Sequence, residues 1–493
     1  MPDNTALVFG THRITYAQMH TAIRRLARGL HDAGVQKGDR IAIMLPNVPH
    51  FCISYYAAFE LGAVAIPVNL MSKEQEITAL LQQSGARCII YWSGFHGVIA
   101  PALRQNPSCE SRMVLGEKIP LDSKSLTRLI ADSPVWEEAC SLEPEDVAVI
   151  NYITSGSDEI LGAEFSHSAL VASALMCHEM YRITAEDRVL AVLPLFHPLG
   201  QTLIMNATFF AGGSVILQAR FNPAETADLL RQEGVTFLAA VPGMFKALSQ
   251  LPPPQPVLSS LRCCLSYGVQ LPEEVLQGFE EKYDALVLEA YGFTEAGPLV
   301  TSNRINQDRK QGSAGLPLVG VELQILDEEG HLLRPNQSGE IWVKSPGLMQ
   351  DYHNKPDKTL QRLRDDWFFS GDVGFLDEDH YLYVQERKED IIQKGGFQIF
   401  SFEVEEVLLQ HPAVAEAAVV GVADAVQGQE VKACVVLKEG VTASRDELIA
   451  FVREQLPFYK SPKYVDLLPA LPKSPTGRVL KRMLRSDQGG KQA

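Results

Sequence analysis

The sequence predicts an α/β protein with a large N-terminal domain, residues 1–386, and a small α+β domain, residues 387–493. A chain of 493 residues is too long for one compact core and suits a large domain followed by a small one. In the first half, helical patterns alternate with short apolar strands, as in a largely parallel sheet with both faces covered. Beyond Gly312 the polarity alternates every second residue, as it does in antiparallel strands.

The elements follow from the spacing of apolar residues. Helical spacing predicts helices at 16–34, 50–61 and 73–84, and short apolar runs predict strands at 40–45, 63–68 and 87–92. The alternation recurs at 211–217, 224–234 and 235–240, and period-two strands are expected within 321–333 and 339–345. The charged segment QERKED, residues 385–390, marks the domain boundary, and a strand–helix–strand–strand–helix series is expected after it.

Composition excludes several classes of protein. The net charge of −16 argues against nucleic acid as the main partner, because phosphate backbones require clustered Lys and Arg. Anionic cofactors stay compatible, since local fields and backbone N–H groups can bind them. The first residues lack a basic segment followed by an apolar run, and no stretch of about 20 apolar residues is free of charged or polar breaks, so we expect neither a secretory signal nor a membrane span. Eight scattered cysteines without a CxxC pair predict reduced, mostly buried thiols in a cytoplasmic protein. We expect a monomer or a homodimer.

The most informative segment is YGFTEAG, residues 291–297. Four segments follow it in order: SGD at 370–372, RKED at 387–390, QKGGFQIFSFEVEE at 393–406 and PKSPTGR at 472–478. Together they resemble the acyl-CoA synthetase branch of the adenylate-forming enzymes, and the resemblance covers nearly the whole chain. It implies a multi-sheet N-terminal domain with a small mobile α+β lid. The implied reaction converts a carboxylic acid, ATP and CoA into acyl-CoA, AMP and pyrophosphate. The overall pattern most resembles family members that act on medium- and long-chain fatty acids.

The resemblance assigns nucleotide contacts to the first segment. Tyr291 matches the aromatic residue that packs against adenine, and Gly292 allows close approach of the backbone. Thr294 matches the hydroxyl that contacts the α-phosphate. Glu295 matches the carboxylate that holds Mg²⁺, a hard ion that takes oxygen ligands. Taken alone, Thr294 and Glu295 are also compatible with an ordinary helix N-cap followed by a glutamate.

Further assignments lie around the predicted boundary. Asp372 matches the carboxylate that accepts both ribose hydroxyls, and Arg387 matches an arginine near the ribose and phosphate. Glu389 matches the hinge about which the small domain would swing. Gly395 and Gly396 match small residues that line the pantetheine tunnel of CoA. An ordinary turn or a solvated linker is the alternative for each of these segments.

Three segments supply the predicted acyl pocket. His197 in FHPLG matches a residue beside the substrate carboxylate, although a lone histidine is more often packed or capping. Gly268 in SYGVQL matches the loop between the acyl pocket and adenine. Val241 and Met244 in VPGMF would line the pocket, and for these apolar residues the core and functional interpretations coincide.

The phosphate loop, YITSGSDEILGAEFSH at 152–167, departs from the family pattern, which carries a lysine that holds the β- and γ-phosphates. Its opening matches at Thr154, Ser155, Gly156 and Ser157. Asp158 and Glu159 then replace small neutral residues, and Leu161 or Gly162 occupies the lysine position. At about 4 Å, each carboxylate would repel the triphosphate by roughly 1 to 4 kcal/mol.

The second departure is Arg478, where the family has a lysine that bridges the substrate carboxylate and the α-phosphate during adenylation. Arginine keeps the charge but is a wide planar fork instead of a point donor. The first hypothesis is therefore an ATP-dependent acyl-CoA ligase with Mg²⁺, whose adenylation step is weakened. The second is a degenerate homologue that binds adenylate or acyl-CoA, or only forms thioester from acyl-AMP. The third is an acyl-AMP ligase that serves a carrier protein.

Overall fold

The chain forms two compact units, which are described separately below. This computed structural model describes residues 1–138, 140–154, 159–252, 260–424, 426–474, 477 and 479–485. The first unit consists of Met1–Glu322 and Val343–Phe368, and the second of Leu323–Trp342 and Phe369–Ala493. Because residues 369–386 group with the second unit, the boundary and hinge expected at 387–390 stay a prediction.

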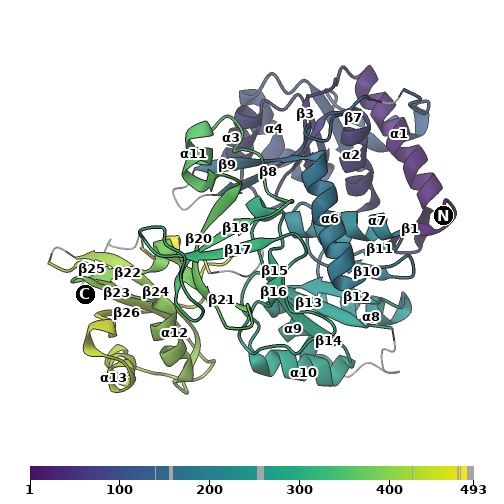
Figure 1. The fold of residues 1–493 in the computed structure, drawn as a ribbon. Coiled ribbons are helices and arrows are strands. Elements are labelled where there is room, and N and C mark those ends of the chain that lie inside the picture. The colour runs from purple at the N-terminus through teal and green to yellow at the C-terminus, as the bar shows by residue number, and fades with distance from the viewer. Residues whose placement is uncertain are drawn as a thin grey trace. The chain divides into compact units, whose positions relative to one another are not determined.

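Two sheets organise the first unit (Figure 1). The larger has the strand order β16-β15-β14-β13-β12-β10-β11-β1-β2. Its strands are β1 (Thr5–Phe9), β2 (His12–Thr15), β10 (Arg188–Ala191), β11 (Ser214–Leu217), β12 (Phe237–Ala240), β13 (Cys263–Tyr267), β14 (Leu286–Tyr291), β15 (Thr301–Ser302) and β16 (Leu316–Pro317). The smaller has the order β7-β6-β5-β3-β4-β8-β9. Its strands are β3 (Arg40–Met44), β4 (Val64–Pro67), β5 (Cys88–Trp92), β6 (Ser111–Leu115), β7 (Lys124–Ser125), β8 (Val147–Thr154) and β9 (Ile160–Ser166).

Helices cover both sheets, as the alternating pattern predicts. One face of the larger sheet packs on α8 (Pro223–Gln232), α9 (Pro242–Ser249) and α10 (Glu273–Tyr283). One face of the smaller sheet packs on α3 (Glu74–Ser84) and α4 (His96–Gln105). The layer between the sheets holds α1 (Tyr16–Asp32), α2 (Pro49–Glu60), α6 (His167–Tyr181) and the π-helix η2 (Gly200–Ala207). The helices and strands expected between residues 16 and 92 are all confirmed as α1, β3, α2, β4, α3 and β5.

The second unit contains two smaller sheets. In the first, β17 (Glu322–Leu326), β18 (Gly339–Lys344) and β20 (Trp367–Leu376) are successive neighbours, and β21 (Leu382–Arg387) pairs with β20. The second has the order β23-β22-β25-β24, with β26 paired to β25. Its elements are β22 (Ile392–Lys394), β23 (Phe397–Ile399), α12 (Ser401–Gln410), β24 (Val414–Asp424), β25 (Gly428–Leu437), α13 (Arg445–Gln455), β26 (Tyr464–Leu467) and α14 (Lys481–Arg485). The expected strand–helix–strand–strand–helix series is confirmed, and the structure adds β23, β26 and α14.

Two expectations from composition can be compared with the structure. All eight cysteines are free thiols, and seven of them are buried, with Cys140 the partly exposed one. Among the helices of the described residues, none has both the length and the apolar character that a membrane-spanning helix requires.

Candidate functional site

The residues predicted for the acyl pocket and adenine lie at the carboxyl ends of neighbouring parallel strands. β10 pairs in parallel with β11 on one side and with β12 on the other. The strand order therefore switches at β10, because β11 is added on one side of it and β12 on the opposite side. Open α/β sheets bind ligands at the carboxyl ends of the strands beside such a switch. His197 follows β10, Val241 follows β12, Gly268 follows β13 and Tyr291 ends β14. The structure therefore brings these four positions to one edge of the larger sheet.

His197 is held by its own turn. Its Nδ1 accepts a hydrogen bond from the Leu199 N–H at 3.2 Å, which places the ring proton on Nε2. Its ring meets Tyr267 edge-on with centroids 6.3 Å apart, and the Tyr267 hydroxyl donates to the Gly292 carbonyl at 2.9 Å. Removal from water lowers the pKa of His197 to about 4, so the imidazole is neutral at pH 7. The capping role is therefore present, and contact with substrate stays a prediction.

The remaining residues predicted for the acyl pocket are Val241, Met244 and Gly268. Val241 is buried at the start of α9, and Met244 packs against the hydrophobic core around Phe245 on the helix-covered face of the sheet. Gly268 has a φ of +102°, a left-handed conformation that favours glycine where the chain leaves β13. The two interpretations of Val241 and Met244 thus still coincide.

Two polar residues that the sequence analysis missed form hydrogen bonds to the backbone at the carboxyl edge of the larger sheet. Asn47 donates from Nδ2 to the Ala191 carbonyl at 2.9 Å and accepts from the Leu195 N–H at 2.8 Å, so it shapes the turn before His197. Glu289 accepts from the Leu271 N–H at 2.9 Å, and burial raises the pKa of this carboxyl. Both had a sequence signal, because each is a polar residue within or directly after an apolar strand.

The YGFTEAG segment leaves the sheet at Tyr291 and forms a 3₁₀ turn, η3 (Thr294–Ala296). Chain packing alone requires Gly292, because a Cβ there would lie 1.9 Å from the Pro298 carbonyl oxygen. Glu295 Oε1 accepts a hydrogen bond from the Tyr352 hydroxyl at 2.8 Å. Burial and the Glu295 charge raise the pKa of Tyr352, which stays a donor. The bond fixes a carboxylate next to the sheet edge, and carboxylate oxygen is the ligand type that suits Mg²⁺.

The segment predicted as the phosphate loop, residues 152–167, contains the end of β8 and all of β9, and these two strands pair antiparallel. Ser155, Gly156, Ser157 and Asp158 lie outside the described residues, as does the side chain of Thr154. Leu161 is buried in β9, and Gly162 lies against Ile150 and Tyr152. Neither candidate for the lysine position therefore offers a polar group to a ligand.

Glu159 has partners that sequence reasoning did not find. Lys355 Nζ lies 2.8 Å from Glu159 Oε1, and Lys358 Nζ lies 3.2 Å from Glu159 Oε2. Hydrogen bonds from both lysines lower the pKa of this carboxyl. The expected repulsion by Glu159 is thus offset by two cations. No sequence pattern signalled this pairing, because it joins segments 196 residues apart.

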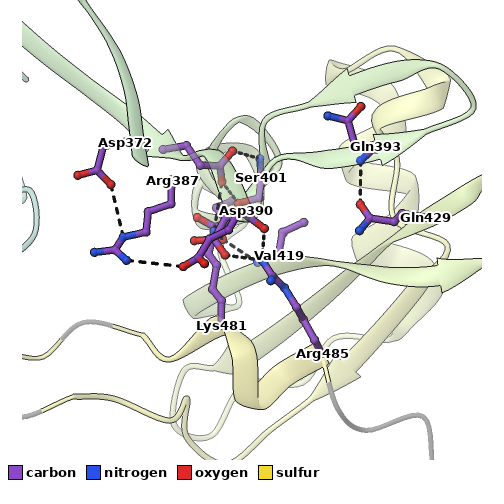
Figure 2. Close-up of polar contacts among 12 residues, drawn as sticks. Asp372, Arg387, Asp390, Gln393, Ser401, Val419, Gln429, Lys481 and Arg485 are labelled. Atoms are coloured by element: carbon purple, nitrogen blue, oxygen red, sulfur yellow. Dashed lines mark hydrogen bonds and ion pairs between the residues drawn. The ribbon is translucent and has the colours of Figure 1, made fainter. Parts of the chain in front are cut away.

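In the second unit, Asp372 and Arg387 face each other across β20 and β21. Arg387 Nε lies 3.4 Å from Asp372 Oδ1 (Figure 2). Arg387 Nη1 lies 3.6 Å from Glu389 Oε1. The Asp372 N–H donates to Ser370 Oγ at 3.0 Å, and this hydrogen bond fixes the backbone at Asp372. The structure therefore brings together the residues predicted for the ribose and for the hinge.

Gly395 and Gly396 form the two-residue turn between β22 and β23. Lys394 pairs directly with Phe397, and both glycines have positive φ, +56° and +85°. A two-residue hairpin turn with two positive φ values favours glycine whatever else it contacts. The turn therefore explains both glycines, and their contact with CoA stays a prediction.

Arg478, the predicted catalytic cation, lies outside the described residues. The neighbouring Lys481 is held in a buried cluster, with its Nζ 2.8 Å from Glu405 Oε1 and 3.4 Å from Glu386 Oε1. It also donates to Ser401 Oγ, and Figure 2 shows Lys481 and Ser401 in this cluster. Burial raises the pKa of Glu386, whereas the Lys481 charge and the Ser401 hydrogen bonds act against that rise.

Known proteins resemble this chain along nearly its whole length. The family profile of the AMP-binding enzyme matches residues 1–353, and that of the AMP-binding enzyme C-terminal domain matches 403–478. A long-chain-fatty-acid–CoA ligase of Bacillus subtilis (strain 168) is 34% identical, over 99% of this chain and 92% of its own. A feruloyl-CoA synthase of an Amycolatopsis species is 33% identical, over 98% and 96%. The crystal structure of ATP-bound MatB from Rhodopseudomonas palustris aligns with a TM-score of 0.90 at 29% identity, over 98% and 95%.

Proposed function

Because the chain belongs to the AMP-binding enzyme family, we propose that it is an AMP-forming acyl-CoA ligase. It converts a carboxylic acid, ATP and CoA into acyl-CoA, AMP and pyrophosphate through an acyl-adenylate. The two relatives above are named for a long-chain fatty acid and for ferulate, which supports the reaction class and leaves the acid open. We take a fatty acid as the first substrate class to test.

One observation carries the proposal. His197, Val241 and Gly268 follow β10, β12 and β13, and Tyr291 ends β14. These four strands are adjacent and parallel to one another, so the residues lie at the same carboxyl edge. This edge is where an open α/β sheet binds a ligand, and it combines apolar lining with few polar groups, as small-molecule sites do. An acyl-adenylate has the matching chemistry, because its acyl chain is apolar and its adenylate is polar.

The residues at this edge have distinct chemical roles. The Tyr291 ring packs against adenine, and the Thr294 hydroxyl donates to the α-phosphate. The neutral Nε2–H of His197 can donate to the carboxylate of the acid. Glu295 would hold Mg²⁺, and the ion would supply positive charge to the phosphates. The hydrogen bond from the Tyr352 hydroxyl keeps the Glu295 carboxylate in one position. This preorganisation lowers the free energy needed to rearrange the site during the reaction.

In the second unit, Asp372 accepts from the ribose hydroxyls while Arg387 remains paired with it. The Arg387–Asp372 and Arg387–Glu389 contacts tie a ribose residue to the hinge candidate through one guanidinium. A swing of the lid about Glu389 would place Arg478 for adenylation in one pose and the Gly395–Gly396 turn for CoA in the other.

A second candidate function is thioester formation from acyl-AMP without efficient adenylation. The buried Leu161 and the absence of a side chain on Gly162 favour it, since the family lysine has no direct replacement in β9. The Lys481 cluster favours it too, because that lysine is held by Glu386 and Glu405. Binding of AMP would be retained in this case.

The test is formation of acyl-CoA, measured by mass spectrometry, with Mg-ATP and CoA over short, medium and long-chain fatty acids and aryl acids. A parallel arm supplies preformed acyl-AMP and CoA. The proposal expects acyl-CoA from one class of acid in the first arm. Product only from acyl-AMP would replace the ligase with the half-enzyme, and no product in either arm would reject both.

A further inference from the structure

The segment that carries Lys355 and Lys358 runs along the outer edge of the phosphate hairpin. The His353 N–H donates to the Gly162 carbonyl at 2.7 Å, and the Glu164 N–H donates to the Asp351 carbonyl at 2.9 Å. Ala163 and Tyr352 form an antiparallel bridge between these two bonds. Residues 351–353 therefore extend the sheet next to β9, on the strand that returns from the phosphate loop.

The two lysines come from the turn that follows this segment. Lys355 precedes the short helix α11 (Pro356–Arg362), in which Pro356 takes the first position. Lys358 is three residues further on, and residues three apart lie on the same face of a helix. Both ammonium groups reach one carboxylate, Glu159, at 2.8 and 3.2 Å. Two positive charges are thereby concentrated at Glu159, a residue of the segment that matches the family's phosphate loop.

The same turn also holds the predicted metal carboxylate. Tyr352 donates to Glu295 at 2.8 Å, and the Lys355 N–H donates to the Tyr352 carbonyl at 2.8 Å. The lysine pair is thus only one turn of chain away from the residue that fixes Glu295. Glu295, which would hold the metal of a bound polyphosphate, is thus hydrogen-bonded to the segment that carries both lysines.

The ion pairs with Glu159 are of a kind that a ligand can displace. The Glu159 side chain is 27% exposed, and those of Lys355 and Lys358 are 39% and 40% exposed. Partly exposed pairs of this type contribute little stability, because water screens both charges. A triphosphate carries more negative charge than one carboxylate and offers several oxygens to each ammonium, so it competes well for both lysines.

We propose that Lys355 and Lys358 replace the missing loop lysine by binding the β- and γ-phosphates of ATP, and that Glu159 holds them in place until the triphosphate arrives. The inference rests on the proposed function for the identity of the ligand. Glu159, which departs from the family pattern, is then the carboxylate that the triphosphate displaces from both lysines.

Equilibrium binding tests this proposal without any chemical step. Calorimetric titrations of the full chain with α,β-methylene-ATP and Mg²⁺, and separately with AMP, report the phosphate-dependent part of the affinity. The Lys355→Ala/Lys358→Ala double variant should weaken the triphosphate by about 30-fold or more, since each charge-assisted contact is worth roughly tenfold. Its affinity for AMP should stay within about twofold of the parent, because AMP lacks both phosphates.

Matched variants separate a specific role from a general loss of charge. Lys344→Ala removes a lysine that is also 39% exposed and also paired, with Asp366 at 3.4 Å, and should leave both affinities unchanged. Glu159→Gln should strengthen triphosphate binding by about threefold or more, because it removes a competing charge. Lys355→Gln and Lys358→Gln remove the charge and keep most of the side-chain length, and they serve as second variants if the double variant fails to fold.

The outcomes distinguish this inference from the proposed function. Unchanged triphosphate affinity in folded lysine variants, an equal loss of AMP affinity, or weaker binding in Glu159→Gln would overturn it. Because neither acid nor CoA is present, a protein that forms no thioester can still pass this test. Conversely, a working ligase whose triphosphate affinity ignores both lysines would keep its function and lose this account of its phosphate site.

Discussion

Two lysine–carboxylate clusters lie in sequence near the two departures from the family pattern, and they differ in burial. Beside the phosphate hairpin, Lys355 and Lys358 pair with Glu159 and have side chains that are 39% and 40% exposed. In the second unit, Lys481 is 16% exposed and its partner Glu386 is 3% exposed. Exposed pairs contribute about 0 to 1 kcal/mol, whereas removing one partner of a buried pair costs about 3 to 5 kcal/mol.

The difference separates lysines that a ligand can recruit from lysines that hold the fold. Lys355 and Lys358 can leave Glu159 at little cost, so they are available to an incoming polyphosphate. Lys481 cannot leave its partners without depriving the buried Glu386 carboxylate of its cation. Closeness in sequence to Arg478 therefore does not make Lys481 a substitute for the family lysine.

The largest expected effect tests the buried side of the comparison. Lys481→Met should lower the free energy of unfolding by about 3 kcal/mol or more, because Glu386 would keep its burial and lose its cation. Urea denaturation followed by circular dichroism measures the change. The control is Lys473→Met, whose pair with Glu416 joins two side chains that are 40% and 41% exposed. That variant should lose less than about 1 kcal/mol, and equal losses in both would erase the proposed contrast.

A smaller effect separates the turn at Gly396 from its predicted contact with CoA. The position has a φ of +85° and open space where a Cβ would lie, so a side chain there is opposed by backbone conformation alone. Gly396→Val should cost about 1 to 2 kcal/mol of stability, whereas Gly396→Asn should cost less because asparagine tolerates this conformation. If the glycine lines the CoA path, Gly396→Asn raises the KM for CoA and leaves the KM for ATP unchanged. A stable Gly396→Asn variant with an unchanged KM for CoA would assign the glycine to the turn alone.

The smallest expected effect extends the contrast in burial to His197. Its pKa of about 4 lies below that of an ordinary histidine, about 6.5, because burial disfavours the charged ring. The neutral form is therefore retained as pH falls through 6.5, and the fold loses stability between that value and about 4, where the folded protein finally takes up the proton. An NMR titration of ¹³C-labelled histidines measures the pKa of His197, and the His197→Gln variant assigns its signal. Titration near 6.5 would mean that the ring is solvated.

The architecture of the first unit was predictable because its signals are local. The helices and strands between residues 16 and 92 depend on apolar spacing within each element, and their positions agree with the structure to within a few residues. The small elements β23, β26 and α14 were not expected. The last two are only four and five residues long, so their apolar periodicity was too short to detect.

The candidate site was predictable only where a motif is contiguous. Tyr291 and Glu295, like Asp372, were found because short segments carry them in a fixed order. The cations near Glu159 were not found, since Lys355 becomes its neighbour through the pairing of residues 351–353 with β9. The two glycines after Lys394 were assigned to CoA, and the structure supplies a sufficient local reason for them in the hairpin turn.

Acid-dependent exchange of labelled pyrophosphate into ATP tests the central claim most directly, because it isolates the half-reaction that both departures affect. The account predicts exchange with one class of carboxylic acid, at a rate that falls in Lys355→Ala/Lys358→Ala and not in Lys344→Ala. It would be contradicted if no acid supported exchange while preformed acyl-AMP still gave thioester with CoA. In that case the lysines beside Glu159 would not restore what the phosphate loop has lost.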